Sequence, residues 1–363
     1  MTKSTVSFLD QGPGQAREFR TGVCLHGHTL HSEECLWFLP RYLSRIPGAA
    51  RLTHHIDFAR AFFTPPLAPA CAFRLERAQI AGLGLRPLVS LTDHDNIEAG
   101  LQLQAAALGE EAPVSVEWTV PYHRSIFHLG VHNLPAASSR AWMSAMAAHT
   151  AAPDESRLPE ILSALDRIPD VLIVLNHPFW LEEGVEDALH RLALDRILRE
   201  CVAWLHAFEL NGTREWPENR DTVKLADAHS RPVISGGDRH GCEPAACLNL
   251  TNAASFSEFV CEVRGGYSSV SFLPHYRHSM TLRILEAACD ILRQYPEYPH
   301  RRRWIDRFFY RDLGGTARSL AALWKDREPL LLRPATGAVQ LLADSSVRGA
   351  LRCFLTRQAE VLP

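Results

Sequence analysis

Histidines and carboxylates recur at the ends of apolar stretches of this chain. The four motifs are His26-Gly27-His28, Thr92-Asp93-His94-Asp95, Asn176-His177-Pro178 and Gly237-Asp238-Arg239-His240. Imidazole supplies nitrogen ligands to divalent metals, and carboxylates supply oxygens that can bridge two ions. In an extended strand residues i and i+2 point to the same side, so His26 and His28 can bind one ion, as can Asp238 and His240. Together the motifs predict a multinuclear metal site.

A simpler interpretation applies to each motif taken alone. The chain has 18 histidines, so one His-x-His pair is weak support for a metal site. The stretch 92–95 could be a turn, with Asp95 capping a helix that begins near Ile97. The metal site is favoured because all four motifs follow predicted strands, an arrangement that is hard to obtain by chance.

Composition limits the class of protein. A chain of 363 residues that is 46% hydrophobic can bury a large core and hold one large domain with an appendage. The net charge of −3 gives no basic field that would favour nucleic acid or an anionic membrane. We expect neither a membrane span nor a signal peptide, because no apolar run is long enough and residues 1–20 are polar. Nine scattered cysteines without Cys-x-x-Cys spacing predict reduced thiols in a cytoplasmic protein.

Short apolar strands alternate with helical stretches over most of the chain. Strands are expected at 22–26, 88–92, 114–119, 126–132, 171–176, 205–211, 232–237 and 268–273. Apolar residues at helical spacing predict helices over 185–201, 220–229 and 257–264. Repeated strand–helix units imply a parallel sheet, and this number of strands favours a closed (β/α) barrel over an open sheet. Active groups of such barrels lie at the C-terminal ends of the strands, where the motifs fall.

Three segments lie outside a minimal barrel. Residues 1–20 are expected to be an N-terminal tail, which leaves 21–275 for the barrel. Residues 35–75 are rich in aromatic residues and proline and are interpreted as an insertion or lid, with the aromatic side chains packing rather than binding ligand. Residues 276–363 are expected to form a helical C-terminal extension without a ligand motif.

Two further residues complete an ordered series. Glu117 ends the apolar run 114–117, and His128 stands in Phe127-His128-Leu129-Gly130. The order His-x-His, Thr-Asp-His, strand-end Glu, His-Leu-Gly, His-Pro and Asp-x-His resembles the PHP family, named for polymerase and histidinol phosphatase domains. The resemblance covers about residues 20–275, including the stretch Phe208-Glu209-Leu210-Asn211. It implies an α/β fold, a distorted seven-stranded (β/α)7 TIM-like barrel.

The resemblance also implies two or three divalent ions, which would be Zn²⁺, Mn²⁺ or Fe²⁺, with Mg²⁺ as a further option. The ligands that it assigns to a first ion are His26, His28, Glu117 and Asp238. Those of a second ion are the bridging Glu117 together with His128 and His177.

A third ion would be bound by His94 and His240 with one more side chain after the first motif. Glu33 aligns best with the position that the family uses, and Glu34 and His31 are the alternatives. The chain also has Cys24 where the family commonly has Asp before the first histidine. These departures affect the third ion and the substrate class but not the first two ions.

The implied function is a metal-dependent phosphoesterase acting on a small phosphomonoester or nucleotide-like phosphate. A pair of cations can activate water and bind the oxygens of a phosphate ester. Asp93 or His240 could orient a ligand or move a proton. Arg239, and also Arg124 and Arg214, lie near motif strand ends and could bind phosphate, because guanidinium matches it bidentately.

Three other functions stay open at this point. Amidohydrolases also begin with His-x-His and end with Asp, but they usually carry a bridging Lys or Glu on a middle strand and a lone terminal Asp. A non-catalytic metal-binding module is disfavoured by the complete ligand sets of the first two ions. A nucleic-acid exonuclease would require the basic stretch 276–334 to fold over the barrel mouth.

Overall fold

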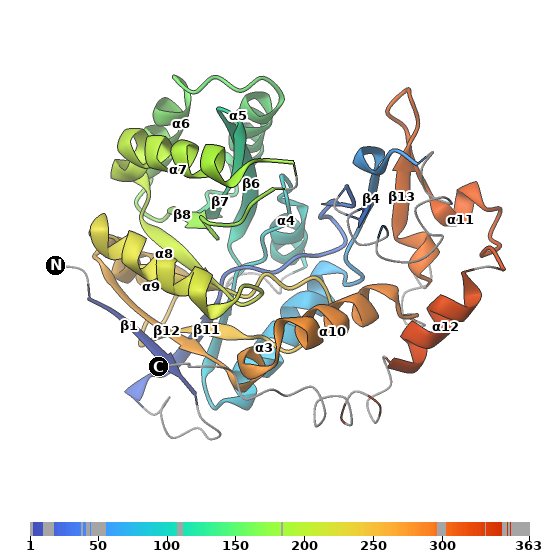
Figure 1. The fold of residues 1–363 in the computed structure, drawn as a ribbon. Coiled ribbons are helices and arrows are strands. Elements are labelled where there is room, and N and C mark those ends of the chain that lie inside the picture. Colours follow the sequence, from blue (N-terminus) through green and yellow to red (C-terminus); the bar gives the residue numbers. More distant parts are fainter. Residues whose placement is uncertain are drawn as a thin grey trace.

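In the part of the chain that the structure describes, the protein has a mixed α/β fold built on two five-stranded sheets and one four-stranded sheet (Figure 1). The computed structural model describes residues 3–9, 18–37, 39–40, 44, 56–106, 112–182, 184–295, 303–330, 332–342, 347 and 349. Parts of the predicted insertion, including Tyr42 and 45–55, and the end of the predicted extension, 351–363, lie outside these residues. Among the described helices, none has the length and apolar character needed to cross a membrane.

The first sheet contains both parallel and antiparallel pairs. Its strands, in spatial order, are β1 (Lys3–Phe8), β12 (Tyr267–Phe272), β11 (Cys247–Thr251), β2 (Thr21–Cys24) and β5 (Arg86–Val89). β2 runs parallel to β5, whereas β11 runs antiparallel to both β2 and β12. β1 lies in the segment predicted as a tail and pairs in parallel with β12.

The second sheet carries most of the motif residues. Its strands, in spatial order, are β10 (Val233–Gly236), β9 (Ala207–Asn211), β8 (Leu172–Asn176), β7 (Ser125–Leu134) and β6 (Val114–Tyr122). β8, β9 and β10 are parallel, but β7 is antiparallel to both of its neighbours. β6 and β7 form a hairpin, so the expected alternation of strand and helix is interrupted here.

The sheets are not closed into the predicted barrel. β2 and β5 leave their ladder at Cys24 and Val89, because the residues that follow turn into the polar motifs. The two sheets still meet at this end through isolated parallel bridges, Gly27 to Arg239 and His94 to Glu117. The motifs therefore lie where the two large sheets touch.

Helices cover the outer faces of these sheets (Figure 1). The helices of the main body are α3 (Pro69–Gly82), α4 (Glu98–Ala105), α5 (Ser139–Ala151), α6 (Leu158–Asp166), α7 (Asp187–Cys201), α8 (Trp216–Ala228) and α9 (Phe256–Arg264). The three predicted helices are confirmed as α7, α8 and α9. A core centred on the buried Trp118, Met146 and Leu162 packs α5, α6 and α7 against β6–β8.

A small antiparallel sheet joins the predicted insertion to the C-terminal extension. Its strands, in spatial order, are β14 (Ala317–Ser319), β13 (Phe308–Arg311), β4 (Ala61–Phe63) and β3 (Glu34–Cys35). The extension is thus not purely helical, although it also contains α10 (Met280–Leu292), α11 (Leu320–Leu323) and α12 (Arg333–Leu342). Strand pairing between segments so distant in sequence ties the two additions into one unit.

Candidate metal centre

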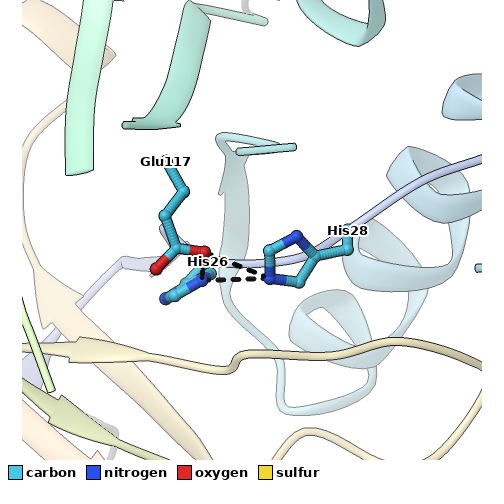
Figure 2. A group of neighbouring side chains, drawn as sticks. All are labelled: His26, His28 and Glu117. Carbon is cyan, nitrogen blue, oxygen red and sulfur yellow. Dashed lines mark hydrogen bonds and ion pairs between the residues drawn. The ribbon is translucent and has the colours of Figure 1, made fainter. Parts of the chain in front are cut away.

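The carboxylate of Glu117 on β6 is the centre of the cluster. Its Oε2 lies 2.9 Å from Nε2 of His26 and 3.5 Å from Nε2 of His28 (Figure 2). The two histidine nitrogens are 3.1 Å apart, so three ligand atoms converge on one point. Nδ1 of His94 lies 3.5 Å from the same oxygen. All of these side chains except His94 are fully buried.

The other oxygen of Glu117 faces a different pair of histidines. Its Oε1 lies 3.1 Å from Nε2 of His177 and 3.4 Å from Nδ1 of His128. The side-chain amide of Asn176 donates a hydrogen bond of 3.0 Å to this oxygen. Burial opposes ionisation, but the surrounding histidines, His26 above all, hold the pKa of Glu117 well below its usual range. Each oxygen of one ionised carboxylate therefore has its own set of nitrogen donors, as a bridging ligand requires.

Asp238 closes the cluster on the side of β10. Its Oδ1 lies 3.3 Å from Nε2 of His28 and 3.8 Å from Nε2 of His26. Its Oδ2 accepts hydrogen bonds from Asn211 Nδ2 at 3.1 Å and Thr213 Oγ1 at 2.9 Å, which fix the carboxylate plane. The backbone of Asp238 has a φ of 50°, a left-handed conformation that non-glycine residues adopt mainly at specialised turns.

A third group forms around Glu34. Its Oε2 lies 3.2 Å from Nε2 of His240 and 3.6 Å from Nε2 of His94, and its Oε1 accepts a hydrogen bond of 2.7 Å from Ser32. Burial opposes the charged form of His240, but the carboxylate of Glu34 raises the pKa of this imidazole to about 10. Of the three candidates, Glu34 is therefore the one whose carboxylate lies against His94 and His240.

The other two candidates for that place point elsewhere. The side chain of Glu33 is half exposed and pairs with Arg311. His31 shares a hydrogen bond of 2.9 Å with Gln102 of α4. Successive residues of a strand face opposite sides, so only one of two adjacent glutamates can reach the histidines. The structure favours Glu34 over Glu33, the residue that the motif spacing placed first.

We expect Glu34→Ala to weaken binding of one metal equivalent selectively, because it removes the only carboxylate of this third group. Glu33→Ala is the matched control and should leave the metal content unchanged, since its side chain lies outside the cluster. Metal content measured by mass spectrometry after gel filtration distinguishes the two. Equal metal content in both variants and the parent would show that His94 and His240 hold no separate ion.

Two residues predicted to act in catalysis have other contacts. Both carboxylate oxygens of Asp93 accept hydrogen bonds from Thr29, from the backbone nitrogen at 2.5 Å and from Oγ1 at 2.7 Å, and burial raises its pKa to about 7. Asp93 therefore positions the segment after His28. Arg239 is buried and reaches α3, where Nη1 lies 2.7 Å from Oε1 of Gln79 and 3.1 Å from Oε1 of Glu76. The structure brings His240 to the cluster but not the guanidinium of Arg239.

The remaining two arginines differ in position. Arg124 is exposed in the turn of the β6–β7 hairpin. Arg214, in contrast, lies beside the cluster, with Nη2 4.0 Å from Oδ2 of Asp238 and its guanidinium 5.5 Å from the ring centre of Trp180. Trp180 in turn stacks on His128, with ring centres 5.2 Å apart.

Glu209 on β9 was not assigned a role from the sequence. Its Oε1 lies 2.6 Å from Nδ1 of His26, and its Oε2 accepts a hydrogen bond of 3.0 Å from the backbone nitrogen of His177. A carboxylate on the far ring nitrogen fixes the tautomer and orientation of a metal-binding histidine. The sequence feature that could have identified Glu209 is its place as a lone glutamate inside the apolar stretch Phe208-Glu209-Leu210. In the sequence analysis this stretch serves only as part of the family resemblance.

The donor set fits divalent metal ions. Within the described part of the chain, this cluster contains four overlapping groups that could each hold an ion, two of which include Glu117: His26, His28 and Glu117; His26, His177 and Glu209; His28, Glu34 and His240; and His94, Glu117 and His128. Imidazole and carboxylate donors suit Zn²⁺, Mn²⁺ and Fe²⁺.

Comparison with known proteins gives distant structural similarity only. No family model matches the chain, and no curated protein matches its sequence. PsfC from Pseudomonas syringae PB-5123 is similar with a TM-score of 0.38 and 15% identity over 71% of this chain and 93% of that one. A protein assigned as a metal-dependent phosphoesterase from Bifidobacterium adolescentis gives 0.33 and 16% over 54% and 91%. An amidohydrolase from Chromobacterium violaceum, with bound sulfate and no metal, gives 0.36 and 16% over 60% and 87%.

Proposed function

We propose that this protein is a metal-dependent hydrolase that cleaves phosphate esters of small molecules. The observation that carries the proposal is the carboxylate of Glu117, whose two oxygens face separate sets of histidines. Two divalent ions held by such a bridge would supply a metal-activated water and would bind the oxygens of a phosphate ester. Glu209 and Asp93 contribute by orienting His26 and the segment that follows His28.

Substrate would reach the cluster through its least buried residues, His94, His240 and Arg214. The side chains of His26, His28 and Glu117 are at most 2% exposed, whereas those of His94, His240 and Arg214 are 19%, 22% and 24% exposed. A substrate group that enters here meets the least buried ligands first. Arg214, at 24% exposure, is likewise less buried than the centre of the cluster.

Arg214 is the feature that favours phosphate esters over amides. Its guanidinium stands over Trp180 and also lies 3.8 Å from Oε1 of Glu218, so its position is defined on three sides. A fixed guanidinium beside the cluster can bind the non-bridging oxygens of a phosphate and stabilise their charge as the ester bond breaks. A neutral amide substrate gains less from this cation.

The proposal is tested by metal analysis of the purified protein and a screen of phosphate monoesters, phosphate diesters, N-acyl amides and oligonucleotides. We expect bound divalent metal and turnover of small monoesters. Turnover of amides alone would identify an amidohydrolase, and salt-dependent retention of oligonucleotides with their degradation would identify a nuclease. Bound metal without any turnover would indicate a metal-binding module.

Arg214→Ala should lower kcat/KM for the best phosphate ester by about 10- to 100-fold, because a hydrogen bond to a charged group contributes about 1.5–3 kcal/mol. Arg124→Ala, on the exposed hairpin turn, is the control and should leave kcat/KM unchanged. Steady-state kinetics on both variants measure the effect. An unchanged kcat/KM in Arg214→Ala would remove the argument for phosphate from this residue.

A further inference from the structure

Glu34 belongs to a strand that is too short to be stable by itself. β3 has two residues and lies at the edge of the small sheet, where Glu34 is opposite Phe63 of β4. β4 in turn pairs with β13 of the C-terminal extension, and Phe63 is opposite Phe308 (Figure 1). An isolated pair of two- or three-residue strands is at best marginally stable in water. The position of Glu34 therefore depends on the third strand.

Aromatic packing holds β4 and β13 together. Phe63 stacks on Phe308 with ring centres 5.5 Å apart, and Phe62 stacks on Phe309 at 5.1 Å. Phe62 and Phe63 are each only 7% exposed. Phe63 also lies 6.5 Å from the ring centre of His240, so this packing extends to a residue of the metal centre.

Arg307, directly before β13, anchors the strand to the body of the protein. Its side chain is fully buried, and Nη2 donates hydrogen bonds to the carbonyl oxygens of Ile291 at 2.6 Å and Arg293 at 2.7 Å, at the end of α10. The carbonyl oxygen of Arg307 accepts a hydrogen bond of 2.9 Å from the backbone nitrogen of Thr64. Contacts thus run without a break from α10 through β13 and β4 to β3.

We propose that the C-terminal extension completes the metal centre, because β13 holds β3 in the position from which Glu34 reaches His94 and His240. The inference rests on the proposed function and concerns the third ion of that site. The two positions that share Glu117 use no residue of β3, β4 or β13, so their ions bind independently of the extension. Glu34 acts as the ligand, and Phe308 is a positioning residue.

The relative strength of the contacts decides which residue to change. The pair of Glu33 and Arg311 is 52% and 40% exposed, and an exposed ion pair changes an equilibrium by less than about fivefold. Removal of a packed phenylalanine has a larger effect, about tenfold or more even at partial burial. Phe308 is the better choice because its partner Phe63 pairs directly with Glu34.

The test is a titration of the full-length, metal-depleted protein with Mn²⁺. Binding is measured by calorimetry, and the bound metal is measured again after gel filtration. Phe308→Ala should bind two equivalents as the parent does and bind the third at least about tenfold more weakly. Tyr310→Ala changes the same strand opposite Ala61, away from Glu34, and should bind all three like the parent. Phe308→Leu, which keeps an apolar side chain, should restore part of the third affinity.

The other possible results of the titration lead to different conclusions. If Phe308→Ala keeps the parent's third affinity while Glu34→Ala loses it, the extension is not needed and the proposal is wrong, although the hydrolase function stands. If Phe308→Ala does not fold, Phe308→Leu takes its place, and an unchanged third affinity in that variant would overturn the proposal. A parent protein that binds no metal would overturn the proposed function together with this inference.

Discussion

Glu117→Gln is expected to lose at least one equivalent of bound metal and to lower turnover by about 10²–10³-fold, the usual size of the loss when one preorganised electrostatic group is removed. Glutamine has the shape of glutamate but one neutral oxygen in place of two charged ones, so it cannot bridge two cations. It can still accept the hydrogen bond from Asn176, and the fold should persist.

The measurement pairs metal content with steady-state kinetics and circular dichroism. Glu98→Gln on α4 is the matched control, because this glutamate forms only a partly exposed ion pair with Arg140. Full metal content and full turnover in Glu117→Gln would assign the carboxylate to ordinary structure. Loss of the folded signal would instead show that burial of the histidines depends on this charge.

Most of the candidate metal centre could be predicted because strand ends concentrate polar side chains at one edge of a sheet. This placement brought His26, His94, His177 and Asp238 into one cluster. His128 lies inside β7 and joins the cluster because it is opposite Asn176 at the end of β8. It could not decide between Glu33 and Glu34, because a shift of one residue reverses the face of a strand.

Arg239 and Glu209 show how far the alternation of side chains along a strand predicts which residues reach the cluster. The strand alternation that we used to pair Asp238 with His240 predicts that the residue between them points away, and Arg239 does point toward Glu76. The segment is nevertheless a turn beyond the end of β10, with Asp238 in a left-handed conformation. The same alternation does not reveal that Glu209 faces His26, because this contact joins residues of different strands. Residues that contact the candidate ligands from behind can be identified only from the three-dimensional arrangement.

The parts of the fold that were not predicted are short or distant in sequence. The strands of the small sheet have two to four residues, which is too few to show an alternating hydrophobic pattern in the sequence. Pairing of β4 with β13 joins segments at opposite ends of the chain. The predicted barrel is wrong at β7 and β11, because both strands run antiparallel to their neighbours. β7 forms a hairpin with β6, and β11 pairs with β2 and β12.

The second large effect is expected at Gly236 on β10. A Cβ atom at this position would lie 1.5 Å from Oε1 and 2.3 Å from Cδ of Glu209, so the carboxylate of Glu209 fits only against a glycine. Gly236→Ala must displace this carboxylate, which removes the partner of His26 Nδ1 and of the His177 backbone nitrogen. Loss of such a partner weakens metal binding by about 10- to 100-fold.

The displacement also strains a buried region, and we expect Gly236→Ala to destabilise the metal-free protein by about 1–3 kcal/mol. Gly82→Ala is the matched control: nothing lies within 4 Å of the added methyl group, and in α3 alanine should stabilise by up to about 1 kcal/mol. Thermal unfolding without metal and a metal titration separate strain from ligand orientation. Glu209→Gln, which creates no clash, should reproduce the weaker metal binding without the full loss of stability. Parent-like affinity in both variants would mean that His26 is held in place by Glu117 and Asp238 alone.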